Sequence, residues 1–423
     1  MKVKLEYGRV GLEANIPDNG NVRTLAYKDA PPLADPHAAL LEVLARPNGA
    51  PPLFELAQGK KDACIVICDI TRPVPNEMIL RPALELLEAA GIARDKITIL
   101  NATGLHRPNH GQELVEMVGQ YIVDHYRIEN HDGENREEHV HLGTSPNGVP
   151  IWIDRRYVEA DLKITVGLIE PHFMAGFSGG RKLICPGIAH IDTIRAWHSP
   201  RFLEHENATM GCLVDNPVHI ENTSIAKTAG CDFIINVVID AHRHPLKFVA
   251  GDMIAAFEEG VEFVRSVVVD TLDKPADIVV TSSAGYPLDT TFYQSVKAMV
   301  AAAKVVKKGG TIIVAASLTE GIGSPPFTSL FSKYDNLNAF MTAILDPDCF
   351  TMDQWQLEEL AKAARQAKIV MVSDGIPAER LSELFVEPAV SVEAAIESAL
   401  AEHGNDASIA VIPKGPYVLA QLA

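Results

Sequence analysis

Apolar runs of strand length, separated by helical patterns, recur along this chain and constrain its fold more than any other feature. In the first half they fall at residues 63–68, 97–100, 162–169 and 233–239. A continuous apolar run is typical of a strand that is buried on both faces, and strands that alternate with helices form mainly parallel sheets. The sequence therefore predicts an α/β fold whose sheets are covered by helices.

A second series of the same kind begins after Pro275. Its strands are expected at residues 278–281, 311–315, 369–372 and 409–412, and a helix is expected from about residue 291 to 306. The alternation again indicates a parallel sheet. Two separate series of strands favour two separate sheets.

Two domains are also expected from length, because 423 residues exceed the size that one hydrophobic core usually serves. We predict an N-terminal domain over 1–268 and a C-terminal domain over 269–399. The tail, 400–423, is expected to return to the first domain, since chain ends often lie close together. Residues 2–7 and 9–14 predict a short opening hairpin. A cleft between two domains is a natural place for an active site.

Composition narrows the class of partner. The net charge of -18 disfavours nucleic acid and anionic membranes, so a small molecule is the expected partner. No apolar segment approaches the roughly twenty residues of a membrane span, and the first residues lack the apolar region of a secretory signal. The chain is therefore expected to be cytoplasmic. The six cysteines are scattered, with no pairing that indicates a zinc site or a disulfide framework.

Polar residues follow four of the expected strands. They are found at residues 69–73, 101–108, 170–172 and 281–287. In open α/β sheets, ligands bind outside the carboxyl ends of the strands. We therefore expect these segments to form the rim of one site.

Two kinds of side chain in these segments suit chemistry. Asp69 and Arg72 could hold a phosphate or carboxylate, because a carboxylate can orient the two-pronged guanidinium group. A surface ion pair that caps the next helix explains the same residues equally well. His106 and His172 suit general acid–base catalysis near neutral pH, although a single histidine is more often structural.

A glycine-rich segment, residues 176–182, could present backbone N–H groups to an anion, although a tight turn would use glycines equally. Lys182, which closes it, would become a nucleophile if partly desolvated, and is otherwise a solvated cation. His198 is a candidate metal ligand or a partly buried structural residue. His139 and His141 share one face of a predicted hairpin, and without a third ligand we assign them to its surface.

Taken together, three motifs resemble the lactate racemase family of nickel-pincer enzymes. They are Asp-x-Thr-Arg-Pro at 69–73, Thr-Gly-x-His-Arg-Pro at 103–108, and Pro-His-x-x-Ala-Gly-x-Ser-Gly-Gly-Arg-Lys at 171–182, and His198 follows them. The resemblance spans nearly the whole chain. The joint occurrence of the motifs is far more specific than any one of them.

The resemblance implies a nickel-pincer nucleotide, Ni(II) pyridinium-3,5-bisthiocarboxylic acid mononucleotide, joined covalently to Lys182. His198 would complete the coordination of nickel, and a planar set of sulfur, carbon and nitrogen donors suits Ni(II). His106 and His172 would be the two proton donors and acceptors, one for each enantiomer. The cofactor-binding residues would be Asp69, Ile70, Thr71, Arg72, Lys182 and His198.

The implied activity is racemisation or epimerisation of 2-hydroxy acids by proton-coupled, reversible hydride transfer through a 2-keto acid. The substrate would be lactate or a related short-chain, dicarboxylic or aromatic 2-hydroxy acid. Cofactor maturation enzymes would be partners. The substrate-binding residues would be Gln294, Lys297, Arg72, Tyr293 and Trp355.

Two other functions remain open from the residues alone. His106, His172 and His198 could form a catalytic zinc site in a hydrolase, since three imidazoles and water suit zinc. The glycine-rich segment could instead belong to a non-catalytic protein that binds a phosphorylated nucleotide. A second substrate carboxylate could bind to an arginine, for which Arg107, Arg181 and Arg195 are candidates.

Overall fold

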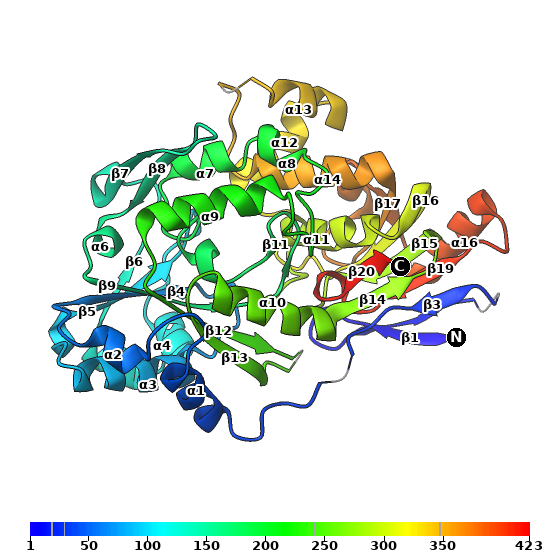
Figure 1. Ribbon diagram of the computed structural model, residues 1–423. Coiled ribbons are helices and arrows are strands. Elements are labelled where there is room, and N and C mark those ends of the chain that lie inside the picture. Colours follow the sequence, from blue (N-terminus) through cyan, green and yellow to red (C-terminus); the bar gives the residue numbers. More distant parts are fainter. Residues whose placement is uncertain (18–19, 29, 241, 347) are drawn as a thin grey trace. The chain divides into compact units, whose positions relative to one another are not determined.

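The computed structural model describes residues 1–17, 20–28, 30–240, 242–346 and 348–423 (Figure 1). The chain forms two compact units. Unit 1 comprises Met1–Lys28, Leu203–His205 and Val267–Ala423, and unit 2 comprises Asp29–Phe202 and Glu206–Ser266. Each unit has its own six-stranded sheet and its own hydrophobic core, so each is described separately.

The sheet of unit 2 has the strand order β13-β12-β9-β4-β5-β6. All neighbours pair in parallel except β13, which runs antiparallel to β12. The predicted parallel α/β architecture is confirmed. The strands are β4 (Ala63–Cys68), β5 (Ile97–Ala102), β6 (Arg127–Asn130), β9 (Leu162–Leu168), β12 (Phe233–Ile239) and β13 (Pro245–Gly251).

Helices cover both faces of this sheet (Figure 1). On one face, Leu40 of α1 and Leu84 of α3 share a core with Ile65 and Val166 of the strands. Gly167 points the other way, and a Cβ there would lie 2.7 Å from Leu183 of the 3-10 turn η3. The helical elements are α1 (Pro36–Ala45), α2 (Leu53–Ala57), α3 (Asn76–Ala89), α4 (Gln112–Val118), α5 (Gln120–His125), α6 (Arg155–Val158), η3 (Gly180–Leu183), α7 (Ile191–Trp197), α8 (Pro200–Leu203), α9 (Pro217–Ala229) and α10 (Ala255–Val268).

The hairpin of unit 2 is formed by β7 (His139–Thr144) and β8 (Pro150–Asp154), which pair antiparallel as their turn signal predicts. The prediction that His139 lies on its surface is wrong. Its side chain is buried, and its ring packs edge-on against the rings of His131 and His190 at 5.0 and 5.1 Å. The alternation of polar and apolar residues in a hairpin strand does not predict which face of the hairpin other segments of the chain will cover.

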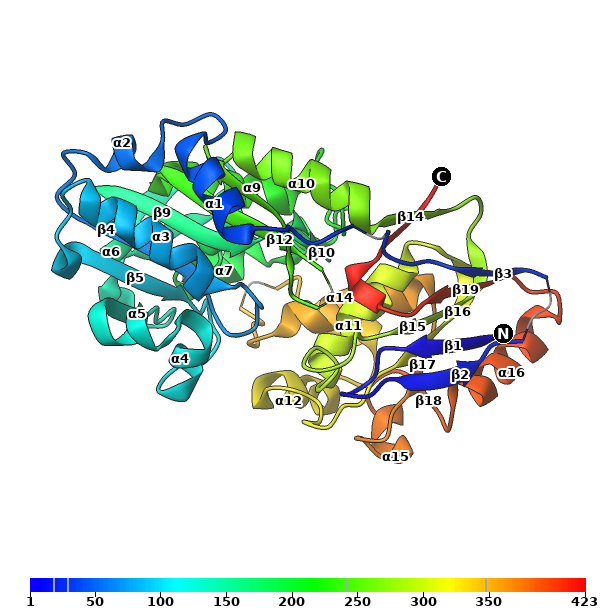
Figure 2. The same cartoon turned by 90° about the horizontal axis from the view of Figure 1, so that it is seen from below.

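The sheet of unit 1 is parallel throughout, in the order β18-β17-β16-β15-β19-β3. Figure 2 shows these strands together with the opening hairpin, β1 (Lys2–Leu5) and β2 (Leu12–Asn15). The sheet strands are β3 (Val22–Thr24), β15 (Ala276–Ser282), β16 (Val306–Ala315), β17 (Ala367–Val372), β18 (Glu387–Ala389) and β19 (Ile409–Ile412).

Helices also flank this second sheet. Val392 and Ile396 of α16 share a core with Val280 and Ile313 of the strands. Helix α11 contacts β15 and β16, and it also packs against α14, which contacts β17. The helices are α11 (Phe292–Ala303), α12 (Pro325–Lys333), α13 (Leu337–Ala343), α14 (Gln354–Gln366), α15 (Ala378–Ser382) and α16 (Val392–His403).

The opening segment differs from the sequence-based domain assignment, which placed it in the N-terminal domain, 1–268. Met1–Lys28 belongs to unit 1 with the C-terminal residues. Leu5 and Ala14 of the hairpin enter the core of unit 1, and β3 extends its sheet by pairing with β19. The alternating sequence of a short hairpin predicts that one of its faces is buried against a hydrophobic core. It does not predict which of the two cores that is.

The tail also differs from expectation. Residues 400–423 were expected to return to the first domain, but β19 pairs with β15 inside the sheet of unit 1. The last strand, β20 (Leu419–Leu422), pairs with β14 (Val269–Leu272) of the same unit. The strands of the tail therefore pair within unit 1.

Among the described residues, no helix is long and apolar enough to span a membrane.

Candidate functional site

Three of the predicted site segments follow neighbouring strands of the unit 2 sheet. Strand β4 lies between β9 and β5, and all three run parallel, so their carboxyl ends share one edge. Residues 69–72 follow β4, His106 lies beyond β5, and His172 lies beyond β9. The two histidines therefore flank the segment that carries Asp69. The fourth predicted segment, 281–287, lies in unit 1.

Asp69 and His106 form a close pair. Asp69 Oδ2 lies 2.6 Å from His106 Nδ1, and Thr71 Oγ1 donates to Asp69 Oδ1 at 2.6 Å. Burial would raise the pKa of Asp69, but the hydrogen bond and charge of His106 and the bond from Thr71 outweigh it, so the pKa lies below its usual value. Asp69 is therefore an ionised carboxylate that orients His106. This is the arrangement of a general base and its positioning residue.

Arg72 has a different carboxylate partner from the one expected. Its Nε lies 3.2 Å from Glu170 Oε1, at the end of β9. Asp69, which was expected to orient this guanidinium group, bonds to His106 and Thr71, and the charge of Arg72 also lowers its pKa. The sequence-based prediction placed Glu170 at the rim of the site, directly after a buried strand, but gave it no role there. Because Asp69 is only 5% exposed, the alternative of a surface pair is also wrong.

His172 is held by backbone groups. It lies in the two-residue strand β10 (Pro171–His172), which pairs with β11 (Gly176–Phe177). Its Nδ1 accepts hydrogen bonds from the N–H groups of Met174 and Ala175, at 3.3 and 3.1 Å. The imidazole also stacks on Phe173, with ring centroids 4.8 Å apart. The ring is therefore fixed from two sides.

Most N–H groups of the glycine-rich segment are already bonded within the protein. Ser178 N–H donates to the carbonyl of Glu170, Gly180 N–H to Asn236 Oδ1, and Lys182 N–H to the carbonyl of Gly179. These three groups do not form the anion cradle that the sequence suggested. At Gly176, with φ of 76°, a Cβ would lie 2.3 Å from a backbone oxygen, so close packing requires this glycine.

Arg181 is the organising side chain of this segment. It is fully buried, and its guanidinium group donates to the carbonyls of Ala175, Phe177 and Gly179 and to His219 Nδ1. Burial lowers its pKa to about 9, so it remains a cation at neutral pH. It is thus not available as an exposed receptor for a second carboxylate. Arg107, another candidate for that role, pairs with Glu113 at 2.6 Å.

Lys182 and His198 are brought together. Lys182, in η3, places Nζ 5.1 Å from the ring centroid of Trp197, the residue before His198. Burial, followed by the charge of Lys182, lowers the pKa of His198 to about 3. His198 Nδ1 donates to the carbonyl of Ile194 at 3.0 Å, which leaves the lone pair on Nε2. A neutral imidazole with this tautomer is a suitable ligand for one metal coordination position.

The four remaining candidates lie in unit 1, on two helices that are joined by hydrogen bonds. Tyr293, Gln294 and Lys297 belong to α11, and Trp355 belongs to α14. Trp355 Nε1 donates to Tyr293 Oη at 3.2 Å. Gln294 Oε1 is buried and has no hydrogen-bond partner among the described residues, so it retains capacity to bind a donor.

Sequence reasoning also missed Asp353. Its Oδ1 accepts a hydrogen bond from Tyr293 Oη at 3.4 Å, and its Oδ2 accepts from Ser324 Oγ at 2.6 Å. Its backbone is in the left-handed region, with φ of 67°, which aspartate tolerates better than most residues. No local pattern marks it, because its partners come from distant segments.

No group of three or more His, Cys, Asp or Glu side chains capable of holding a metal ion occurs among the described residues. His106, His172 and His198 are all described and do not form such a group. The zinc hydrolase alternative therefore lacks its ligand set. A metal that arrives with its own ligands would need only one protein donor, and His198 fits that requirement.

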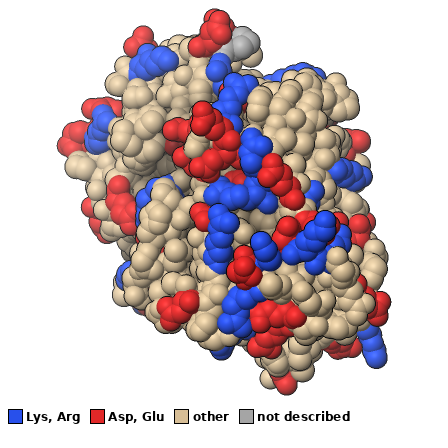
Figure 3. Space-filling model, turned by 90° about the vertical axis from the view of Figure 1, so that its left-hand side faces the viewer, with Lys and Arg blue, Asp and Glu red and all other residues tan. Residues whose placement is uncertain are grey.

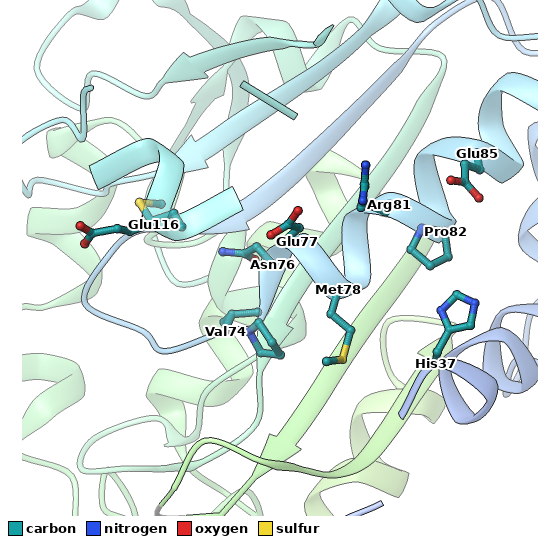
Figure 4. Close-up of a pocket in the computed structure, with 11 residues that line it drawn as sticks. His37, Val74, Asn76, Glu77, Met78, Arg81, Pro82, Glu85 and Glu116 are labelled. Carbon is teal, nitrogen blue, oxygen red and sulfur yellow. The ribbon is translucent and has the colours of Figure 1, made fainter. Parts of the chain in front are cut away.

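A cavity of about 570 Å³ in unit 2 lies apart from these residues (Figure 4). Its lining includes His37, Asn76, Met78, Arg81 and Glu116. None of the predicted site residues lines it.

Surface charges on the face shown in Figure 3 are interleaved, with Lys and Arg beside Asp and Glu. Ion pairs of this kind include Arg156 with Glu138 at 3.0 Å and Arg127 with Glu129 at 2.8 Å. Carboxylates therefore neutralise neighbouring basic groups in these pairs.

The parallel sheets define an α/β protein, and its candidate site contains a carboxylate paired with a histidine, Asp69 and His106, and a lysine close to a buried histidine, Lys182 and His198. The family description "Lactate racemase N-terminal domain" matches residues 7–211, and "Lactate racemase C-terminal domain" matches residues 271–420. The chain belongs to the lactate racemase family, whose named members are isomerases.

Two curated relatives align with most of this chain. It is 37% identical over 424 residues to a lactate racemase from Thermoanaerobacterium thermosaccharolyticum, covering 99% of each protein. It is 38% identical over 382 residues to a lactate racemase from Lactiplantibacillus plantarum, covering 89% of each. The resemblance inferred from the motifs is thus confirmed at the level of the family.

Solved structures support the same fold. The lactate racemase apoprotein from Thermoanaerobacterium thermosaccharolyticum matches with a TM-score of 0.93 and 36% identity, over 100% of both chains. A Thermotoga maritima protein matches with a TM-score of 0.71 over 92% of this chain and 98% of that one. Its identity is 18%, so it supports the fold alone.

Proposed function

We propose that this chain interconverts the enantiomers of a short 2-hydroxy acid, and that lactate is the first substrate to test. Family membership supports racemisation, because two relatives named lactate racemase align with most of the chain. The single structural observation that carries the proposal is the 2.6 Å contact between Asp69 Oδ2 and His106 Nδ1. It leaves the lone pair of His106 on Nε2, where it can accept a hydroxyl proton.

Removal of the hydroxyl proton is the work of His106 for one enantiomer, and His172 would do the same for the other. As the proton leaves, electron density on oxygen increases, so the hydrogen on C2 can depart as hydride and a 2-keto acid forms. Asp69 stabilises the imidazolium that results, because its carboxylate faces Nδ1. Return of hydride to the opposite face of C2, followed by return of the proton to oxygen, gives the other enantiomer.

A nickel-pincer nucleotide, when bound, would supply the hydride acceptor. Lys182 would provide the amine for attachment, and His198 would provide one neutral imidazole donor for nickel. The segment Asp69, Ile70, Thr71 and Arg72 would line the nucleotide. Since Asp69 is bonded to His106, Arg72 is the residue of this segment best suited to phosphate. Maturation enzymes that make and attach the cofactor are the implied partners.

Binding of the substrate carboxylate falls to Lys297 and Gln294. An ammonium group can fix a carboxylate together with the N–H of a neighbouring carboxamide. Tyr293 and Trp355 form a rigid hydrogen-bonded wall that limits the space for the substrate side chain. Arg72 remains a further candidate for the substrate. The expected cleft between the domains remains a prediction.

The direct test is a chiral assay on protein produced in cells that also make the cofactor. Intact mass and metal content establish loading, and each enantiomer of lactate is then followed by chiral chromatography. We expect a covalent adduct, bound nickel and conversion of either enantiomer to the racemic mixture. Protein from cells without the cofactor pathway is the control.

A panel of malate, 2-hydroxybutyrate and phenyllactate would then rank the 2-hydroxy acids. Loaded protein that racemises none of them would overturn the enzymatic proposal. That result would favour the non-catalytic nucleotide-binding alternative. Faster turnover of a larger acid than of lactate would revise the substrate and leave the reaction class intact.

A further inference from the structure

The loop that carries Asp69, residues 69–73, is bonded to the loop that carries His106, residues 103–109, at more than one point. Besides the contact between Asp69 Oδ2 and His106 Nδ1, Ile70 N–H donates to Asn109 Oδ1 at 3.3 Å. The side chain of His106 is 55% exposed, so packing alone does not hold its ring. The position of the ring therefore depends on its loop, which Asn109 connects to the loop of Asp69.

The carboxamide of Asn109 is buried, and its orientation is determined by its partners. The atom that faces Ile70 N–H must be the oxygen, because a backbone N–H can only donate. At the other end, Nδ2 donates to Glu113 Oε2 at 3.1 Å. Hydrogen bonds from Arg107 and then from Asn109 lower the pKa of Glu113 to about 2, so this acceptor is ionised at neutral pH. Both ends of the carboxamide thus have matching partners.

Two further asparagines hold Asn109 against the sheet. Asn101, in β5, donates from Nδ2 to Asn109 Oδ1 at 3.0 Å and to Asn130 Oδ1 at 2.8 Å. Asn130, at the end of β6, accepts from Asn109 N–H at 3.1 Å and donates to the carbonyl of Asn109 at 2.9 Å. Because β5 and β6 pair directly, Asn109 is anchored to two neighbouring strands.

Short connections lead from Asn109 to both members of the pair. Ile70 N–H shares a peptide plane with the carbonyl of Asp69, and that carbonyl accepts from Arg72 N–H at 3.1 Å. On the other side, two residues separate Asn109 from His106, and one of them is a proline, which fixes its own φ and restricts the residue before it. A change at Asn109 should therefore alter the separation of Asp69 and His106.

We propose that Asn109 is a positioning residue for proton transfer, and that its buried carboxamide sets the separation of Asp69 and His106. This inference rests on the proposed function, in which that pair takes up the hydroxyl proton. Asn109 acts through the pair and needs no contact with the substrate. An uncharged side chain suits this position, because a carboxylate there would repel Glu113.

Asn109→Ala in the loaded enzyme tests the role through kinetics. We expect kcat to fall by about tenfold or more with little change in KM, because a misplaced acid–base pair slows the chemical step. Leu84→Ala, in the core of the same unit, is the control. It should lower stability through a cavity but keep the wild-type kcat. An unchanged kcat in Asn109→Ala, or an equal loss in both variants, would overturn the proposal.

A double variant shows whether Asn109 acts through the pair. In an Asp69→Asn background, Asn109→Ala should have little further effect on kcat, since the carboxylate that it positions is already gone. Losses that multiply in the double variant would mean that Asn109 acts elsewhere, and would overturn the proposal. If Asn109→Ala does not fold, Asn109→Ser, which keeps an oxygen on Cβ, takes its place with the same expectations.

A second measurement does not depend on activity. In the cofactor-free chain with 15N-labelled histidine, the proton between His106 Nδ1 and Asp69 Oδ2 should give a far-downfield NMR signal, because this hydrogen bond is short. Its loss in His106→Gln assigns it. We expect Asn109→Ala to shift or abolish the signal and Leu84→Ala to leave it in place.

The two proposals can fail separately in this measurement. A signal that is unchanged in Asn109→Ala would overturn the positioning role. A signal that shifts as expected, in a chain that racemises no 2-hydroxy acid when loaded, would support the positioning role and count against the proposed function.

Discussion

The two units fix their candidate site residues in different ways. In unit 2, His106 and His172 lie in segments that follow strands, and a carboxylate or backbone N–H groups hold each ring. In unit 1, Tyr293 and Trp355 lie on two helices and hold each other through side chains. The chemistry proposed for unit 2 thus depends on the path of the backbone, whereas the binding proposed for unit 1 depends on helix packing. Substitutions should therefore have sharper effects in unit 2.

The units also differ in the ionisable groups that burial keeps from becoming charged. Unit 2 buries histidines, and burial is the main cause that lowers the pKa of His139 to about 4 and that of His219 to about 3. Unit 1 buries carboxyl groups on α14. Burial is again the main cause, and it raises the pKa of Glu358 to about 9 and that of Glu359 to about 7. The pKa shifts of these histidines and of these carboxyl groups therefore make the two units respond to pH in opposite directions.

The largest effect is expected from Lys182→Ala in unit 2. This change removes the amine proposed to carry the cofactor, so covalent attachment should be lost entirely while the fold survives. Intact mass after production in cofactor-making cells measures this directly. Lys227→Ala, at an exposed position of α9, is the matched control and should keep the adduct. An adduct that persists in Lys182→Ala would place the anchor elsewhere.

Asp69→Asn should follow, with a loss of about a hundredfold in kcat. The amide cannot stabilise the imidazolium form of His106, so the loss should fall on kcat more than on KM. Steady-state kinetics of the loaded enzyme give both values. Asp95→Asn, at an exposed position, is the control and should match the wild type. A change in KM alone would mean that Asp69 serves binding instead of proton transfer.

Tyr293→Phe tests the role proposed for the helices of unit 1, which is to bind the substrate. It removes the Oη that accepts from Trp355 Nε1 and donates to Asp353 Oδ1 at 3.4 Å, and a neutral hydrogen bond such as the one from Trp355 is worth about 1 kcal/mol. We therefore expect KM for the 2-hydroxy acid to rise by roughly five- to tenfold with little change in kcat. Thermal denaturation distinguishes loss of the wall from loss of the fold. A fall in kcat as large as that expected for Asp69→Asn would contradict the proposal that unit 2 serves chemistry and unit 1 serves binding.

The smallest effects concern stability and pH. A buried histidine with a lowered pKa binds fewer protons folded than unfolded, so unit 2 should lose stability as the pH falls below the ordinary value of 6.5. A buried carboxyl group with a raised pKa binds more protons folded, so unit 1 should lose stability as the pH rises from 4.5 towards 9. Hydrogen exchange resolved by peptide should show unit 2 opening first in acid and unit 1 first in alkali.

Glu358→Gln isolates the alkaline part of this behaviour. Both carboxyl oxygens of Glu358 are buried without a hydrogen-bond partner among the described residues, so ionisation there is strongly disfavoured. The amide cannot ionise, and unit 1 should gain at least about 1 kcal/mol at pH 9 with little change at pH 5. Glu397→Gln, at an exposed position of α16, is the control. Equal shifts in both variants would contradict the account.

Much of the architecture was predictable, because buried parallel strands leave continuous apolar runs such as 63–68 and 233–239. The placement of Met1–Lys28 and of the tail was not. The sequence of a short strand at a sheet edge predicts which of its side chains are buried, but it does not predict which strand it pairs with. The two sheets became clear only through pairings such as β3 with β19.

The sequence offered candidate site residues at strand ends, but it did not predict the bonds between them. His106 and Asp69 were both expected at strand ends, yet their direct contact depends on two loops that meet only after folding. The partner of Arg72 was missed for the same reason, since Glu170 comes from a third strand. Strand ends therefore indicate which residues meet, and loop conformation decides which atoms bond.

Arg181 has a consequence for transplanting this site into another scaffold. Its guanidinium group lies 4.0 Å from the ring centroid of Phe257 and donates to His219, and both residues are distant in sequence from the glycine-rich segment. Three carbonyls of that segment converge on the same cation. Segment 171–182, grafted into another protein, would therefore lose its conformation unless that protein supplied an aromatic ring and a hydrogen-bond acceptor for Arg181. The smallest unit that could be transplanted is therefore segment 171–182 together with the parts of α9 and α10 that contact Arg181.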